Sequence, residues 1–137
     1  MIKALKIVMI IYGALFILMG LVEFIAPDIS YSLQGFQNPP IYIHMYQGVS
    51  AVCFIVAGIW IIVAGRDPHR NINLVRFAIT LSALLLANDI FMAVRGYFNV
   101  IALSPLMAID VIFGILLLVF YPWHQARSSI DPSIQKQ

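Results

Sequence analysis

From Ile41 to Ala64 the sequence reads IYIHMYQGVSAVCFIVAGIWIIVA, with no lysine, arginine, aspartate or glutamate anywhere along it. An α-helix rises 1.5 Å per residue, so about 20 apolar residues are enough to cross the roughly 30 Å hydrocarbon core of a bilayer. This stretch therefore predicts a transmembrane helix.

Three further apolar stretches accompany it: Ile2–Ala26, Asn73–Tyr97 and Pro105–Tyr121. The first two are long enough to span with tilt, and the last is at the short limit. Lipid offers no partner to unpaired backbone groups and four strands cannot close a barrel, so each span must be a helix. The sequence predicts an all-α fold, a transmembrane four-helix bundle over residues 1–126 with a short cytoplasmic tail at 127–137.

Proline and glycine mark the predicted helix ends. Pro27 follows the first helix and would stop it. Gly65 stands where the second helix would take a glycine C-cap. Ser104 is the predicted N-cap of the fourth helix, with Pro105 at its first helical position.

The composition agrees with a lipid environment. Hydrophobic residues make up 62% of the chain and charged residues 10%, whereas a soluble domain carries about 25% charged residues. The net charge is only +2 and no basic run occurs, which argues against nucleic acid as a partner. Cys53 is the only cysteine, so disulfides, CxxC redox pairs and cysteine-based zinc sites are excluded.

Basic residues in the short loops predict the orientation. Lys3 and Lys6 begin the chain, and Arg66 and Arg70 lie between the second and third spans, whereas residues 27–40 contain no lysine or arginine. Both termini are therefore predicted to be cytoplasmic, N-in/C-in. The absence of an Asn-x-Ser/Thr acceptor and of other targeting signals favours the cytoplasmic membrane of a prokaryote, as a multi-pass protein of its cell membrane.

Polar side chains inside the predicted spans need a reason, because a charge at the middle of the membrane costs about 2.5–3.5 kcal/mol on the insertion scale. Counted from the outer helix ends, they fall in one layer in the outer half of the membrane. Ser82 and Asp89 are seven apart and line one stripe of their helix. The residues predicted to line an outward-facing, ligand-binding polar pocket are Glu23, His44, Gln47, Asn88, Asp89, Arg95 and Asp110.

Each of these side chains also has a plainer interpretation. Glu23 and His44 lie near the interface and would reach water there, and Arg95 would snorkel outward. Asn88 and Gln47 are of the type that bonds neighbouring helices together. The two deeper aspartates are equally open to interhelical hydrogen bonding and to function. Their coincidence in depth is the observation that favours a shared pocket.

Small residues indicate where helices approach each other closely. Gly13 and Gly20 are seven apart and therefore share one face of the first helix. The other small residues interpreted in this way are Gly48, Ala51, Ala83, Ala87 and Gly114.

The stretch YGALFILMGLVEF, residues 12–24, resembles the opening helix of DoxX-like small four-helix membrane proteins, in which two glycines seven apart precede a polar or charged residue and an aromatic. Overall length, four spans and cytoplasmic ends are also similar. The resemblance implies a four-helix bundle and, as in some relatives, a subunit role in quinone-linked respiratory or sulfur oxidation. It carries over to Gly13, Gly20 and Glu23. A more distant likeness is to four-helix sterol- and lipid-binding membrane proteins.

Recognised catalytic motifs are absent from the sequence: HExxH, GxSxG, the P-loop and the glycine-rich dinucleotide fingerprint. His69 and His124 are predicted at one membrane boundary and His44 at the other, which excludes a bis-histidine haem between helices. No cofactor is therefore named. An enzyme is the least favoured reading, with a membrane isomerase using one acid and one base left open.

Two functions of different kinds stay open. The first is a binding pocket for a small amphiphile, a quinone or a lipid, in a protein that acts alone or as a subunit of a larger membrane complex. The second is a proton-coupled small transporter in which Asp89 or Asp110 titrates. Four helices lack inverted halves, so such a transporter would work as a dimer. A purely structural membrane subunit is a third reading.

Overall fold

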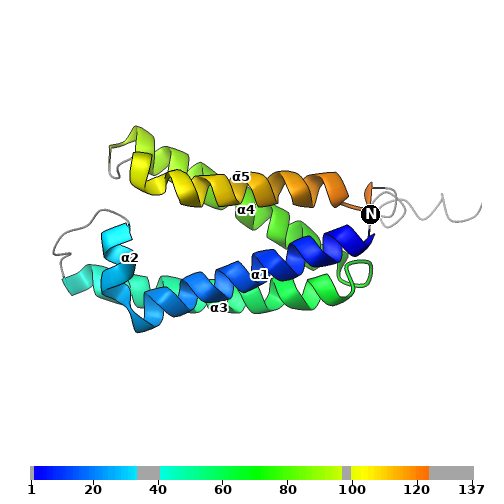
Figure 1. The fold of residues 1–137 in the computed structure, drawn as a ribbon, viewed down its shortest axis with the longest axis horizontal. Coiled ribbons are helices and arrows are strands. Elements are labelled where there is room, and N and C mark those ends of the chain that lie inside the picture. The colour runs from blue at the N-terminus through cyan, green and yellow to red at the C-terminus, as the bar shows by residue number, and fades with distance from the viewer. Residues whose placement is uncertain (1, 34–40, 97–99, 124–137) are drawn as a thin grey trace, which may run out of the picture.

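The computed structural model describes residues 2–33, 41–96 and 100–123. It contains the helices α1 (Ile2–Ile25), α2 (Pro27–Leu33), α3 (Ile41–Arg66), α4 (Ile72–Val94) and α5 (Val100–Phe120), and no strand within those ranges. The all-α prediction is confirmed. Two antiparallel pairs make up the molecule, α1 with α3 and α4 with α5 (Figure 1).

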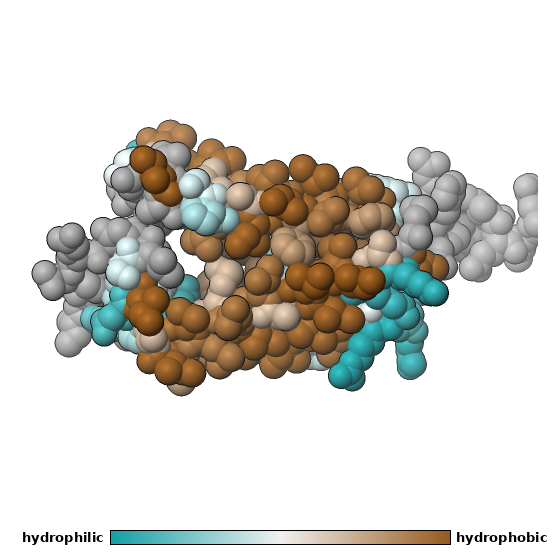
Figure 2. Space-filling model, in the orientation of Figure 1, coloured by the Kyte–Doolittle hydropathy of each residue, from teal (hydrophilic) through white to brown (hydrophobic). Residues whose placement is uncertain are grey.

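Within the described residues, three helices are long and apolar enough to cross a membrane: α1, α3 from Ile43 to Arg66, and α4. The apolar part of α5, Ser104–Phe120, is shorter. Large hydrophobic side chains cover the outer sides of the helices, as the mostly brown surface in Figure 2 shows. In water such a surface would be an aggregation hazard, whereas lipid solvates it.

The two ends of the molecule differ in charge. The start of α1, the turn after α3 and the end of α5 gather at one end, and α2 lies at the other (Figure 1). We call these the basic end and the α2 end. The basic end holds Lys3, Lys6, Arg66, Arg70 and Arg76, whereas Arg95 is the one described basic residue of the α2 end.

Glycines bring α1 and α3 into backbone contact. A Cβ atom on Gly13 would lie 2.6 Å from the Gly58 carbonyl oxygen, and a Cβ on Gly58 would lie 2.6 Å from that of Gly13. One Cβ on Gly20 would be equally close to the Ala51 carbonyl oxygen. The predicted close-approach face of Gly13 and Gly20 is confirmed, and it explains how the largely apolar helices α1 and α3 pack tightly.

The other small residues give a mixed outcome. Gly114 faces Ser82, whose Oγ would lie 3.1 Å from an added Cβ. Gly48 has open space where its Cβ would be, and Ala83 and Ala87 are exposed. For these last three the packing prediction is wrong, because the faces that carry them do not meet a neighbouring helix.

The fourth predicted helix begins earlier than its proline suggested. α5 starts at Val100, and Pro105 lies inside it. The Ser104 hydroxyl donates to the Ile101 carbonyl oxygen at 2.9 Å, which is the carbonyl that the missing N–H of Pro105 leaves without its helical partner. The N-cap prediction for Ser104 is therefore wrong. Its hydroxyl lies inside α5 and replaces the hydrogen bond that Pro105 cannot donate.

One other predicted boundary needs correction, and part of one predicted loop is helical, although α1 does end before Pro27 as predicted. α3 continues to Arg66, and the buried Gly65 packs its backbone against Met9, whose Cβ would lie 3.1 Å from a Cβ added there. This glycine is a packing position and not a C-cap. The segment after Pro27 forms the short helix α2, with the proline at the first helical position, where its missing N–H is not needed.

The buried core lies in the half of the molecule nearer the basic end. There all four long helices converge on Leu5, Met9, Ile61, Val75 and Leu117. Arg76 Nε donates to the Tyr121 hydroxyl at 2.7 Å and so ties α4 to the end of α5. Toward the α2 end the two pairs separate, and an opening between them is visible in Figure 2.

Candidate functional site

Three side chains from three helices meet where the pairs begin to separate. The Tyr12 hydroxyl of α1 donates to Asp110 Oδ1 of α5 at 3.1 Å. Ser82 Oγ of α4 donates to the Asp110 carbonyl oxygen at 2.9 Å. All three residues are buried, Asp110 with 8% of its surface exposed. We call this group the Asp110 cluster.

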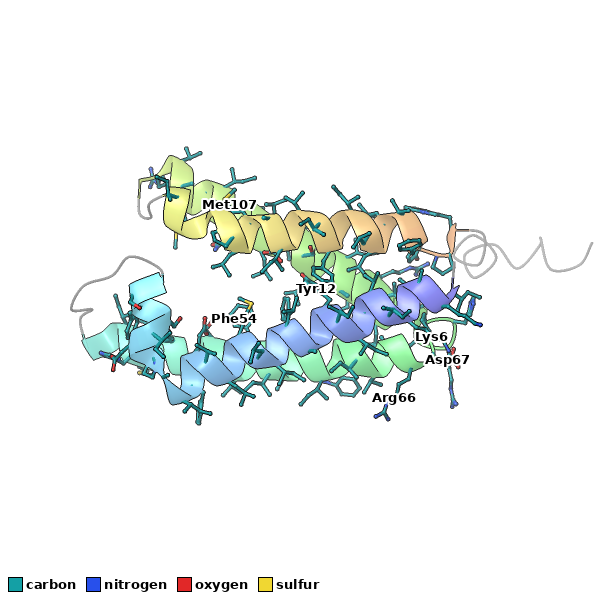
Figure 3. The ribbon with its side chains drawn as sticks, in the orientation of Figure 1. Lys6, Tyr12, Phe54, Arg66, Asp67 and Met107 are labelled. Atoms are coloured by element: carbon teal, nitrogen blue, oxygen red, sulfur yellow. The ribbon has the colours of Figure 1, made fainter. Side chains whose placement is uncertain are left out.

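Aromatic rings hold Tyr12 in place. Its ring stacks on Phe113 with centroids 4.7 Å apart, and Phe16 meets it edge-on at 4.8 Å. Phe16 in turn contacts Phe54 of α3 at 5.4 Å. Tyr12 and Phe54 both point into the space between the helix pairs (Figure 3). The Tyr12 hydroxyl is thus aimed at Asp110 by packing on both sides of its ring.

A cavity of about 60 Å³ adjoins the Asp110 cluster on the side of the α2 end. By volume it has room for a few water molecules. All four long helices contribute to its wall, which is apolar on α1 and α3 and carries two carboxyl groups on α4 and α5. Its lining residues are Phe16, Met19, Phe54, Leu85, Asp89, Leu106, Ile109 and Asp110.

A second polar group lies nearer the α2 end, on the same helix faces. Glu23 follows Phe16 by seven residues and Met19 by four, and Gln47 precedes Phe54 by seven, so both share the faces of α1 and α3 that line the cavity. Ser50 of α3 lies within hydrogen-bonding reach of the Glu23 carboxyl. We call Glu23, Gln47 and Ser50 the outer polar cluster, and the whole space from it to the Asp110 cluster the interhelix cleft.

The outer polar cluster holds polar atoms that the protein does not satisfy. Glu23 Oε2 and both side-chain polar atoms of Gln47, Oε1 and Nε2, are buried without a hydrogen-bond partner. Gln47 itself is only 8% exposed. Buried polar groups in folded proteins are nearly always paired, so such atoms need an explanation.

Of the predicted site residues, Asp89 and Asp110 line the cavity, whereas Glu23 and Gln47 lie farther toward the α2 end on the same faces of α1 and α3. Asp110 is ten residues into α5, about 15 Å from its first residue, whereas Glu23 is two residues from the end of α1. Asp110 therefore lies farther from its helix end than predicted, because α5 begins at Val100 and not at Pro105.

His44, Asn88 and Arg95 also lie outside the cavity lining. His44 is exposed, and its Nδ1 lies 3.0 Å from the Tyr31 hydroxyl of α2. Burial, with the carboxylates of Asp28 and Glu23, raises the pKa of Tyr31, so its hydroxyl stays protonated. Asn88 is exposed beside Asp89. Arg95 is the exposed C-cap of α4, with its guanidinium 5.7 Å from the centre of the Phe91 ring.

Sequence reasoning missed Tyr12 as a site residue. A tyrosine in an apolar helix does not by itself indicate whether its hydroxyl is buried and hydrogen-bonded. The bond from Tyr12 to Asp110 is seen only in the folded structure. Ser82 did carry a signal, because its spacing of seven from Asp89 places both on one stripe. In the part of the chain that the structure describes, no group of three or more His, Cys, Asp or Glu residues is arranged to hold a metal ion.

Comparison with family models, with curated proteins and with solved structures gives no match to this chain. Its class therefore rests on the fold and the surface. The chain is an α-helical membrane protein, with apolar helices long enough to span and, between them, a mostly apolar cavity that carries two carboxyl groups.

Proposed function

We propose that the chain crosses the cytoplasmic membrane of a prokaryote four times, N-in/C-in, and binds a small amphiphile, a quinone or a lipid, in the interhelix cleft. The observation that carries the proposal is the cavity walled by all four long helices. Phe16, Met19 and Phe54 offer it an apolar side, and Asp89 and Asp110 offer polar groups at its edge. Ligand pockets combine mostly apolar walls with a few such groups.

Two features support the fourth span and the orientation. α5 runs over 21 residues, about 31 Å at 1.5 Å per residue, and lies alongside α4. The ends of α3 and α5 and the starts of α1 and α4 share the basic end (Figure 1). Loops rich in lysine and arginine stay in the cytoplasm, which favours that end as the inner one.

The likeness to DoxX-like proteins belongs to the same proposal. Gly13 and Gly20, two of the three residues that carry it, make the backbone contacts between α1 and α3. Glu23, the third, lies in the outer polar cluster with a buried, unpartnered oxygen. Each residue of the resemblance thus has a physical task in this fold, either in packing or in the cleft.

Filling the cavity tests the binding site. Leu85→Trp adds a ring where Leu85 lines the cavity, so native mass spectrometry of the purified protein should show at least about a tenfold loss of any co-purified quinone or lipid, equivalent to about 1.4 kcal/mol. Leu84→Trp is the matched control, because Leu84 is 63% exposed on the adjacent surface and its variant should retain the ligand. A wild type without bound amphiphile, or equal ligand content in both variants, would contradict the proposal.

Thiol labelling tests the topology. In a Cys53→Ser background, a membrane-impermeant maleimide applied to intact cells should label Ser32→Cys at the α2 end. Asp67→Cys and Trp123→Cys, at the basic end, should react only after the membrane is permeabilised. Labelling of Trp123→Cys from outside would show that α5 does not cross, and labelling of Asp67→Cys from outside would reverse the orientation.

A further inference from the structure

We infer that the outer polar cluster is a head-group subsite that selects a neutral amphiphile bearing hydroxyl groups. The inference deepens the proposed function and rests on it, since a head group is held there only if an amphiphile occupies the cleft. It assigns Gln47 and Glu23 a role in ligand choice.

Burial is the first support. Gln47 is 92% buried by surface, as the complement of its 8% exposure, yet neither atom of its amide has a partner. Leaving a buried polar group unpaired destabilises the folded protein, and native proteins contain few such groups. One more unpaired atom, Glu23 Oε2, lies on the adjoining helix. A bound molecule that reaches all three atoms would remove these penalties.

The kinds of atoms define the head group. Gln47 Nε2 donates, Gln47 Oε1 accepts, and an ionised Glu23 Oε2 accepts. A hydroxyl group does both, so two hydroxyls are able to donate to the two oxygens while one of them accepts from Nε2. A head group that only accepts, such as an ether, an ester or a quinone carbonyl, would leave both oxygens unpaired.

Charge argues against an anionic head group. A phosphate or carboxylate would bring more acceptors beside Glu23 and Asp89, whose side chains are themselves acidic. Most of the described basic residues, including Lys3, Arg66 and Arg70, lie at the opposite end of the molecule (Figure 1). Like charges at close range in a poorly solvated cleft repel strongly. A neutral hydroxyl-bearing head group avoids that repulsion.

The rest of the cleft suits the chain of such a molecule. Phe16, Met19, Phe54 and Leu85 line the cavity, on the same faces of α1, α3 and α4 and one to two turns or more from the outer polar cluster on α1 and α3. The cavity takes only a short length of chain, and an opening between the helix pairs is visible toward the α2 end (Figure 2). The remaining alkyl chain would lie there against lipid.

Paired probes test the inference. Native mass spectrometry of the full chain in nanodiscs would compare 1-O-dodecylglycerol, which has two free hydroxyls, with its 2,3-di-O-methyl ether and with dodecyl phosphate. We expect wild type to bind the glycerol ether at least about tenfold more tightly than either other probe, the effect of one to two hydrogen bonds. Gln47→Met, which removes the amide and keeps the length, should reduce that preference to within about twofold.

The control variant is Asn73→Ala, which removes an exposed amide at the start of α4, at the opposite end of the molecule, and should keep the wild-type preference. Equal binding of the three probes by wild type, displaced by Leu85→Trp, would overturn the subsite while leaving the proposed function standing. Failure of every probe to bind would remove both. The comparison of the three probes on wild type tests the subsite without any variant. The test therefore holds even if the Gln47→Met protein fails to fold.

Discussion

Gly13→Ala should lower the free energy of unfolding by about 2–3 kcal/mol, at the upper end of the range for overpacking a close contact. The added methyl group would lie 2.6 Å from the Gly58 carbonyl oxygen and 2.7 Å from Ile62 Cγ1. The carbonyl belongs to a helix backbone and has no rotamer to change, so α1 and α3 must move apart. Separation would also weaken the second contact, at Gly20, one heptad away. Denaturation in mixed micelles by titration with sodium dodecyl sulfate measures the loss.

The matched control is Gly48→Ala on α3. A Cβ there meets nothing within 4 Å, and alanine has a higher helix propensity than glycine by about 1 kcal/mol. This variant should be as stable as wild type or slightly more stable. Equal losses at Gly13 and Gly48 would show that the effect is not the helix contact. Gly13→Ala combined with Gly58→Ala should cost less than the sum of the two, because the first substitution already separates the helices.

The second large effect is expected at the Asp110 cluster. Asp110→Leu leaves the buried Tyr12 hydroxyl without the acceptor that lies 3.1 Å away, which should lower the free energy of unfolding by about 1–3 kcal/mol. Tyr12→Phe removes the donor. A double-mutant cycle between them should give a coupling of about 1–2 kcal/mol, near the upper values measured between membrane helices. The same micelle titration supplies all four free energies.

Two further variants separate hydrogen bonding from charge. Asp110→Asn retains an oxygen that accepts from Tyr12, so most of the stability should return. Asp89→Leu should have a smaller effect than Asp110→Leu, because Asp89 is only partly buried at the cavity edge. A coupling near zero between Tyr12 and Asp110 would mean that their contact contributes nothing to stability and that Asp110 is retained for another reason.

Long-range composition made the spans predictable, whereas local rules misplaced some of their ends. The run from Ile41 to Ala64 contains no charged residue. Because an apolar segment in lipid must satisfy its own backbone hydrogen bonds, its helical structure follows from the sequence. Pro105 and Gly65 satisfy the ordinary signals for a helix start and a helix end. In the structure, contacts outweigh both signals. The Ser104 hydroxyl supplies a hydrogen bond within α5, and Gly65 packs against Met9.

The candidate site was predicted in part. Glu23, Gln47, Asp89 and Asp110 stand out as polar residues in apolar helices, and two of them, Asp89 and Asp110, line the cavity. The position of Asp110 along its helix depended on where α5 begins. The partner of His44 was not predictable, because Tyr31 belongs to a helix that was expected to be a loop.

The gradient in packing along the molecule separates the positions that confer stability from those that are free to change specificity. Near the basic end, a core of fully buried side chains holds all four long helices together, so a substitution there acts first on folding. Toward the α2 end, the pairs part and polar atoms lack partners, so fewer contacts between the two pairs can be lost there. Mutations in that half change which molecule is bound while the protein stays folded. Stability and activity usually conflict, but here the residues responsible for each lie in different halves of the molecule. For an engineer, the open half is the region to randomise and the tight half is the scaffold to leave alone.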